Sequence, residues 1–260
     1  MITGGSRGIG RAVALRLARD GAHCVITYRQ NADLADLAVR AIEQEGARGL
    51  ALALDLCDPT QVARIFDRIA EAFGRVDILV ANAAATAFRP LAEQSERHVR
   101  LTLAISVESF IAAVNAAARL MRGRPGRVIG ISGIDSFQAM HGHGVLGGAK
   151  AALESLVRAF ALELGPDGVT VNGINPGFVS TDSSRLYLER GLGRAYDAAV
   201  AEITEATPVR RIGTVEDVAA CAAWIASDEA AFLTGQTIVL DGGLTIVSPL
   251  MRLAGSPQPS

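Results

Sequence analysis

The chain has 260 residues, about half of them apolar, and a formal net charge of −2, which fits one large α/β domain with a single substantial core. The small net charge, with both signs scattered along the chain, favours neither a nucleic-acid nor an anionic-membrane partner. No uninterrupted apolar run approaches the roughly 18 residues that span a bilayer, so we expect a soluble globular protein.

Short apolar runs alternate along the chain with longer stretches of helical period. We predict strands at residues 23–28, 48–54, 76–81, 127–132, 169–172 and 237–240. Helices are predicted at residues 9–20, 34–44, 96–121, 145–164 and 215–226, and around an apolar face formed by Val62, Ile65, Phe66, Ile69 and Phe73. This alternation implies βαβ units and thus one doubly wound, Rossmann-type parallel sheet in a single domain over residues 1–260. Residues 248–260 are expected to form a partly flexible tail.

The N-terminal segment carries the first chemical signal. Residues 3–10 read TGGSRGIG and open a helix. Glycines there allow a tight turn and bring backbone N–H groups close to a pyrophosphate, beside the positive end of the helix dipole. A tight turn without a ligand is the alternative. Only Met1 and Ile2 precede Thr3, so either the first strand is very short or the true start of the protein lies upstream.

Further motifs follow this turn in a characteristic order. They are Asp55-Leu56, Asn82-Ala83-Ala84, Asn175-Pro176-Gly177 with Thr181, Thr234-Gly235-Gln236 and Asp241-Gly242-Gly243. Together with the glycine turn, they resemble the motifs of the short-chain dehydrogenase/reductase family over essentially the whole chain. The resemblance implies that a nicotinamide cofactor is held by Thr3, Gly4, Ser6, Arg7, Gly8, Ile9, Gly10, Tyr28, Arg29, Asp55, Leu56, Asn82, Ala83, Ala84, Lys150, Pro176, Gly177, Val179 and Thr181.

The end of the strand at residues 23–28 bears on the choice of cofactor. An acidic residue at this place would bind the ribose 2′-hydroxyl of NAD. Here Arg29 follows Tyr28, and a second arginine, Arg7, lies in the glycine turn. A guanidinium pairs well with a 2′-phosphate, so the sequence predicts NADP(H). Two solvated surface arginines are the alternative interpretation.

The catalytic region departs from the family pattern. That pattern has Tyr-x-x-x-Lys, a serine about thirteen residues before the tyrosine, and an asparagine in the preceding long helix. Lys150 matches the lysine, but Leu146 stands at the tyrosine position. Gly133 stands at the serine position, beside Ser132, and Ser106 at the asparagine position. Ketone reduction leaves an alkoxide that needs a proton and charge stabilisation, so these losses disfavour it unless a neighbouring group substitutes.

His143 is the candidate substitute. It lies seven residues before Lys150, which is the Tyr-x6-Lys spacing of some enoyl-thioester reductases. Two helical turns separate these residues by roughly 10 Å along the axis, so direct cooperation between them is not expected. An imidazole can donate a proton at neutral pH. We therefore predict Lys150, His143 and Ser132 as catalytic residues. The alternative is that His143 is a loop histidine before a helix, with no catalytic role.

Three functional hypotheses remain. Residues 82–85, 88–90 and 150–156 are similar to enoyl-acyl-carrier-protein reductases of the Tyr-x6-Lys type, so the first hypothesis is NADPH-dependent reduction of an enoyl thioester, with His143 or water delivering the proton. The second is a ketone reductase, such as a 3-oxoacyl reductase, with a substituted acid. The third is a cofactor-binding protein without redox chemistry. Candidate pocket walls, which could also be ordinary core, are Phe137, Met140, Phe178 and residues 186–192.

Partners and compartment follow indirectly. The predicted substrate is a small-molecule or carrier-bound acyl group, and the family resemblance implies a homodimer or homotetramer packed through residues 96–121 and 145–164. Cys24, Cys57 and Cys221 are odd in number and widely spaced, which argues against a disulfide framework or a metal site. No basic segment followed by an apolar run opens the chain, so a cytoplasmic location is expected.

Overall fold

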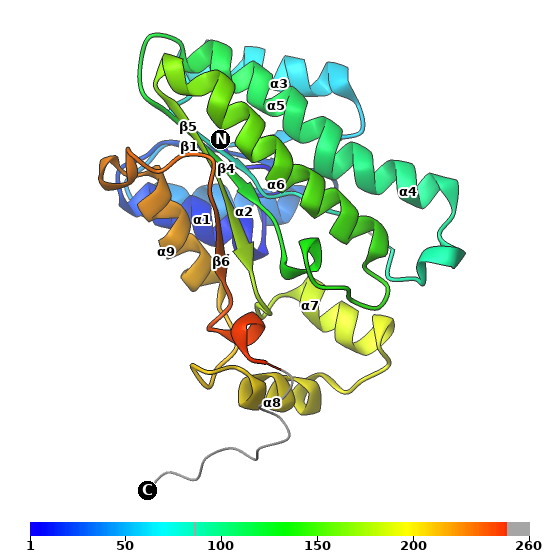
Figure 1. Ribbon diagram of the computed structural model, residues 1–260. Helices are drawn as coiled ribbons and strands as arrows, with labels where there is room; N and C mark the ends of the chain where they lie inside the picture. The colour runs from blue at the N-terminus through cyan, green and yellow to red at the C-terminus, as the bar shows by residue number, and fades with distance from the viewer. Residues whose placement is uncertain (86, 249–260) are drawn as a thin grey trace, which may run out of the picture.

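Six parallel strands form the sheet of this computed structural model, which describes residues 1–85 and 87–248 (Figure 1). The pairing order is β2–β1 on one side and β3–β4–β5–β6 on the other. The strands are β1 (Cys24–Tyr28), β2 (Gly49–Ala53), β3 (Ile78–Ala81), β4 (Gly126–Ile131), β5 (Val169–Pro176) and β6 (Thr237–Leu240). The predicted Rossmann-type architecture is therefore confirmed. The predicted tail lies outside the described residues except for Ser248.

A very short segment at the N-terminus joins the two groups of strands. Ile2 forms parallel bridges to Ile26 of β1 and to Val80 of β3. Its N–H donates to the Val25 carbonyl at 2.8 Å, and its carbonyl accepts from the Thr27 N–H at 3.0 Å. The N-terminus thus lies in the middle of the sheet (Figure 1), and the chain passes from there directly into the glycine turn.

Helices cover both faces of the sheet (Figure 1). One core cluster joins the sheet to α1 (Gly8–Arg19), α2 (Ala32–Gln44) and α9 (Val215–Ala226). The other joins it to α3 (Pro59–Phe73), α5 (Ser109–Met121) and α6 (Gly144–Leu164). Because strands covered on both faces are buried throughout, β4 and β5 expose none of their residues.

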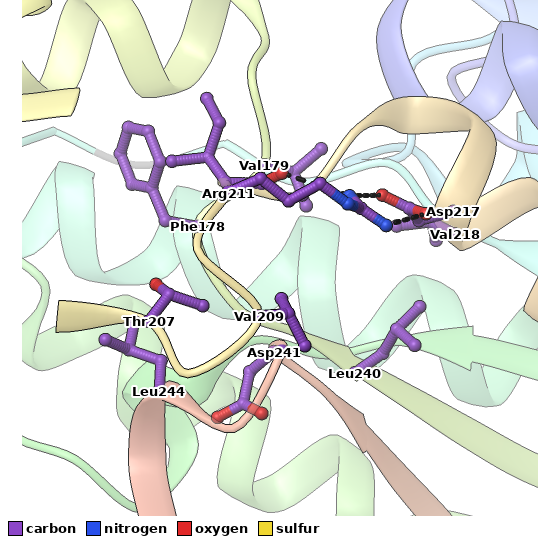
Figure 2. A pocket seen from close by; sticks show the side chains of 13 residues that line it. Phe178, Val179, Thr207, Val209, Arg211, Asp217, Val218, Leu240, Asp241 and Leu244 are labelled. Atoms are coloured by element: carbon purple, nitrogen blue, oxygen red, sulfur yellow. Dashed lines mark hydrogen bonds and ion pairs between the residues drawn. The ribbon is translucent and has the colours of Figure 1, made fainter. Parts of the chain in front are cut away.

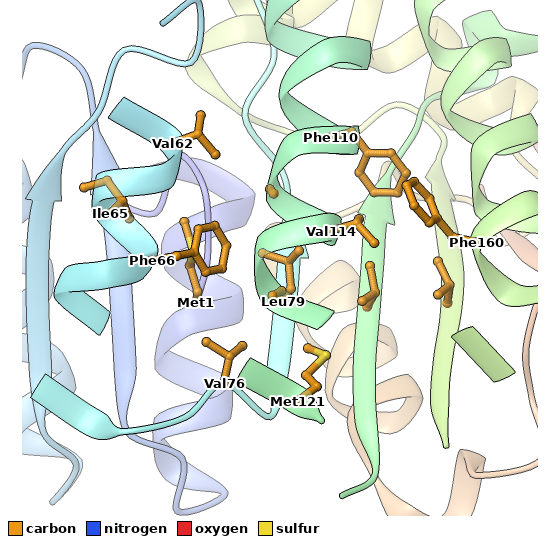
Figure 3. Packing of buried hydrophobic residues seen from close by; sticks show 14 of the residues in the cluster. Met1, Val62, Ile65, Phe66, Val76, Leu79, Phe110, Val114, Met121 and Phe160 are labelled. Atoms are coloured by element: carbon orange, nitrogen blue, oxygen red, sulfur yellow. The ribbon is translucent and has the colours of Figure 1, made fainter. Parts of the chain in front are cut away.

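Helix α3 shows how local sequence sets an element. Its N-cap Asp58 accepts hydrogen bonds from the N–H groups of Thr60 and Gln61, Pro59 occupies the first turn, and Gly74 ends the helix in the left-handed conformation. The predicted apolar face is buried except for Phe73, which is half-buried. Figure 3 shows this face packing beside side chains of α5 and α6, where Phe110 meets Phe160 edge to face at 5.9 Å between ring centroids.

The structure corrects three predicted segments. The single helix expected at residues 96–121 is α4 (Glu96–Leu103), a π-helical turn (Ala104–Glu108) and then α5. The strand predicted at residues 169–172 continues to Pro176 as β5. Its last four residues, Gly-Ile-Asn-Pro, have a loop-like composition, but they pair with β6. Residues 182–207, for which no structure was predicted, form α7 (Asp182–Leu186), a π-helical turn (Tyr187–Gly191) and α8 (Tyr196–Ala206).

The stretch Glu96–Met121 is also the one candidate membrane span among the described residues, by its 26-residue length and mean hydropathy of 1.6. Its apolar side chains are used inside the protein, since Phe110, Val114 and Met121 of α5 are buried in the core. Core helices of soluble proteins share this composition, so the stretch is best described as a core helix.

Candidate active site

The predicted site residues gather where the parallel strands end. The glycine turn follows Ile2, Arg29 follows β1, Asn82 follows β3 and Ser132 follows β4, while Gly177 follows β5. In a parallel sheet these carboxyl ends form one edge, and ligands of open α/β sheets bind there. Motifs that are far apart along the chain therefore lie together at this edge.

The glycine turn is locked to the loop after β3. Thr3 Oγ1 accepts hydrogen bonds from the backbone N–H groups of Asn82 and Ala83 at 2.9 and 3.0 Å. In return, Asn82 Nδ2 donates to the Thr3 and Gly4 carbonyls at 3.0 and 3.2 Å. A Cβ at Gly10 would lie 2.4 Å from the Gly4 carbonyl oxygen, so only glycine permits this close approach.

The turn also presents the N-terminus of α1. Gly4 and Gly8 have φ values of +66° and +54°, which glycine adopts without strain. The N-cap residue is Arg7, whose guanidinium has no acceptor and therefore leaves the first-turn N–H groups of α1 without a side-chain cap. Those groups, at the positive end of the helix dipole, fit a pyrophosphate.

Arginine side chains flank this turn. Arg29 is exposed directly after the half-buried Tyr28. Arg7 forms an ion pair with Asp182 at 3.7 Å, with 59% and 83% of the two side chains exposed. An ion pair so exposed contributes little to stability, so Arg7 can exchange this partner for a phosphate. In the turn after β2, the Asp55 carboxylate accepts the Cys57 N–H at 3.0 Å.

The segment after β5 is held from two sides. The Gly177 N–H donates to the Leu240 carbonyl at 3.0 Å, and a Cβ at Gly177 would lie 2.7 Å from that of Asp241. Val179 bridges to Gly213. Thr181 forms a capping box with Ser184 at the start of α7. The predicted cofactor-binding residues of this segment, Pro176, Gly177, Val179 and Thr181, are thus held in place together.

A cavity of about 140 Å³ lies beside this segment. Figure 2 shows Phe178 and Val179 on its wall, near the paired side chains of Arg211 and Asp217. Among the described residues that line it, none is a predicted catalytic residue. The cavity is therefore separate from the catalytic residues.

Lys150 is buried on α6. Its Nζ donates to the Ile131 carbonyl, at the end of β4, at a distance of 2.6 Å. Burial lowers the pKa of the Lys150 ammonium from 10.5 to about 8, and the negative charges of Asp135 and Glu154 act in the opposite direction. The lysine is therefore held at the carboxyl edge of the sheet by a short hydrogen bond, with two carboxylates near it.

Ser132 belongs to a hydrogen-bond network beside this lysine. Its Oγ donates to Glu154 Oε1 at 2.6 Å, and Asn175 Nδ2 donates to the same oxygen at 2.7 Å. Asn175 also donates to Ser136 Oγ at 2.9 Å. The network ties β4, α6 and β5 together and uses the Ser132 proton within it. A catalytic role for Ser132 remains a prediction.

His143 is the N-cap residue of α6. Its Nδ1 lies 3.0 Å from Asp135 Oδ2. The imidazole stacks on Phe88 at 5.2 Å and meets Tyr187 edge to face at 4.3 Å between ring centroids. Its Nε2 is buried and has no hydrogen-bond partner among the described residues.

Asp135 was not among the residues predicted from the sequence. This residue lies in a short 3-10 turn, Ile134–Ser136, after the carboxyl end of β4. The signal was present in part, because an acidic residue there is at the ligand-binding edge of the sheet. Its pairing with a histidine eight positions later follows no helical or strand period, and only the structure shows it.

Each family-pattern position that has changed has a defined place in the structure. A Cβ at Gly133, the serine position, would lie 2.6 Å from Asp135 Oδ1. Ser106, at the asparagine position, is buried in the π-helical turn, and its Oγ has no partner among the described residues. Leu146, at the tyrosine position, is half-buried on α6.

Apolar side chains make up a further cluster near His143. Its buried members are Tyr187, Leu188 and Ala199, with Phe88, Met140, Phe178, Tyr196 and Val200 packed against them. Of the predicted pocket walls, Met140, Phe178, Tyr187 and Leu188 lie in this cluster. Phe137 is 53% exposed instead.

A parallel sheet whose carboxyl edge carries this glycine turn defines a dinucleotide-binding α/β protein. Residues 4–245 match the family model described as enoyl-(acyl carrier protein) reductase. The chain is 38% identical to 1-cyclohexenylcarbonyl-CoA reductase of Streptomyces collinus, over 96% of this chain and 87% of that protein. The chain belongs to the short-chain dehydrogenase/reductase family of oxidoreductases.

Other relatives extend this comparison. The chain is 33% identical to the 3-oxoacyl-[acyl-carrier-protein] reductase of Escherichia coli strain K12, covering 95% of this chain and 97% of that one. A short-chain dehydrogenase from Burkholderia cenocepacia J2315, solved in complex with NADP, superposes with a TM-score of 0.84 at 35% identity. That match covers 94% of this chain and 96% of the other.

Proposed function

We propose that this protein is an NADPH-dependent reductase of the conjugated double bond in α,β-unsaturated acyl thioesters. The observation that carries the proposal is Leu146 at the tyrosine position of the family pattern. Reduction of a ketone produces a localised alkoxide, which needs a positioned acid. Reduction of a conjugated double bond produces a delocalised enolate, which a weaker or more distant proton donor can protonate.

The residues at the sheet edge fit the proposed cofactor. The first turn of α1 suits the pyrophosphate, and Arg29 with Arg7 suits a 2′-phosphate. Lys150 and the segment Pro176–Thr181 would hold the nicotinamide end. When bound, NADPH supplies a hydride equivalent to the substrate.

The protein's own groups then act on the substrate. The buried Lys150 ammonium places positive charge at the sheet edge, where it stabilises negative charge that develops nearby. His143 is the proposed proton donor, and the apolar cluster around Tyr187 would contact the acyl group. The description of the matching family model and the activity for which the Streptomyces relative is named support this substrate class.

The proposal is tested by following NADPH absorbance with three coenzyme A thioesters. Crotonyl-CoA and 1-cyclohexenylcarbonyl-CoA carry conjugated double bonds, and acetoacetyl-CoA carries a ketone. We expect oxidation of NADPH with one or both unsaturated thioesters and little with acetoacetyl-CoA. Oxidation with acetoacetyl-CoA alone would overturn the proposal in favour of a ketone reductase, which the Escherichia coli relative exemplifies.

A further inference from the structure

A buried carboxylate stands where the family pattern has a serine side chain. The Asp135 side chain is only 6% exposed. Its Oδ1 lies so close to Gly133 that a Cβ there would be 2.6 Å away, while its Oδ2 faces His143 Nδ1 at 3.0 Å. The space gained by losing a side chain at position 133 is therefore used by a carboxylate that binds an imidazole.

This contact fixes the ring of His143. A carboxylate oxygen can only accept a hydrogen bond from Nδ1, so Nδ1 carries a proton. Phe88 and Tyr187 hold the ring from two further directions. The remaining nitrogen, Nε2, is thereby set in one orientation.

The buried Nε2 has no partner among the described residues. A buried polar atom left unpaired costs about 1–3 kcal/mol, so such atoms are normally satisfied by water, an ion or a ligand. A bound substrate or an ordered water at Nε2 would remove this cost. This observation is independent of the Asp135 contact and also points to a ligand at His143.

We propose that Asp135 is the positioning residue of the reductase: it accepts the Nδ1–H of His143 and holds Nε2–H as the proton donor to the substrate enolate. This inference rests on the proposed function. Hydride addition at the β-carbon leaves an enolate. Its electron pair forms a C–H bond at the α-carbon as the Nε2–H bond of the imidazolium breaks, and the neutral imidazole then takes a proton from water.

Other titratable groups surround this pair. Lys150 and Glu154 come from α6, and Tyr187 comes from the π-helical turn after α7. Burial raises the pKa of the Tyr187 hydroxyl, and the negative charge of Asp135 raises it further. That hydroxyl donates to the His141 carbonyl at 3.0 Å, so its proton is already used within the protein. His143 is therefore the proton donor that Asp135 can position.

The test compares Asp135→Asn, His143→Ala and the double variant, with crotonyl-CoA and NADPH. We expect kcat to fall about 10²-fold or more in His143→Ala, at least about 10-fold in Asp135→Asn, and no further in the double variant.

The exposed carboxylate Asp197 on α8 provides the matched control, and Asp197→Asn should keep the wild-type kcat. Equal effects of Asp135→Asn in the presence and absence of His143 would show a merely structural role and overturn the inference. The 15N chemical shifts of the His143 ring give a second readout without substrate, and Nδ1 should carry a proton in the wild type because it donates to Asp135. An Nδ1 without a proton would overturn the inference even if the enzyme reduces enoyl thioesters, whereas absent turnover in the wild type would count against the proposed function alone.

Discussion

At the scale of single residues, we propose that Arg29 decides which cofactor this site accepts. Arg29 follows β1 at the place where an NAD-binding protein needs a carboxylate, and its side chain is exposed and free to meet a phosphate. The sequence predicted this choice from charge alone, because one charged side chain at a fixed position governs it.

Replacing Arg29 with aspartate tests that choice. We expect Arg29→Asp to raise the KM for NADPH about 10- to 100-fold, because a charge-assisted hydrogen bond to the 2′-phosphate is replaced by repulsion. The KM for NADH should change far less. Steady-state kinetics with both cofactors measures this, with Arg68→Asp on the exposed face of α3 as the control. Equal effects on the two cofactors would contradict the assignment.

Lys150 is the second residue whose environment has a measurable consequence. Burial lowers its pKa to about 8 in the folded protein, whereas the unfolded chain keeps a value near 10.5. Below pH 8 both states are protonated, and the buried charge costs about 3 kcal/mol of stability. Between pH 8 and 10.5 the unfolded state binds more protons, so this cost disappears as pH rises.

The free energy of unfolding should therefore rise between pH 8 and 10 in the wild type relative to Lys150→Met. Comparison with that variant cancels the opposite contributions of the buried cysteines and Tyr187, whose pKa values are raised. Urea unfolding at several pH values measures the difference. A difference that stays constant or shrinks over this range would contradict the predicted burial of the ammonium.

At the scale of elements, the contact between α6 and the turn Ile134–Ser136 shapes the catalytic region. A Cβ at Gly147 would lie 2.3 Å from the Asp135 carbonyl oxygen, while a Cβ at the neighbouring Gly148 would meet nothing within 4 Å. The two glycines sit side by side in one helix but face opposite surroundings. Gly147 lets the turn carrying Asp135 approach the helix that carries Lys150.

These two glycines give a matched pair of variants. Gly147→Ala should lower the free energy of unfolding by about 2 kcal/mol or more, since backbone must move to admit the methyl group. Gly148→Ala should raise it by up to about 1 kcal/mol, because alanine favours the helix. Chemical unfolding compares them. Similar effects at both positions would contradict the close packing of the turn on α6.

The same contact shows where prediction from sequence ends. The helices and strands were predictable because their apolar spacing repeats. The family motifs could be recognised because they have fixed spacing in short loops, and the cofactor role of their residues remains a prediction. The π-helical turn at residues 104–108 and the Asp135–His143 pair were not predictable, because neither follows a repeat. They depend on tertiary packing, which places Asp135 opposite His143, the N-cap residue of α6.

At the scale of the whole molecule, the sheet brings cofactor motifs from residues 3 to 181 onto one edge, beside the changed catalytic positions. The N-terminal segment fills the centre of that sheet, where Ile2 bridges β1 and β3 and the Met1 carbonyl accepts the Val80 N–H. A homodimer or homotetramer remains a prediction from the family resemblance. In the proposed reaction, hydride reaches a carbon–carbon double bond at this edge and no tyrosine is needed.

Transfer of deuterium from NADPH to the substrate tests this reaction. The purified protein is incubated with crotonyl-CoA and NADPH carrying deuterium at both C4 positions, and the product is analysed by mass spectrometry and NMR. We predict butyryl-CoA with one deuterium at the β-carbon. Formation of no labelled saturated thioester, together with labelled 3-hydroxybutyryl-CoA from acetoacetyl-CoA under the same conditions, would contradict the account.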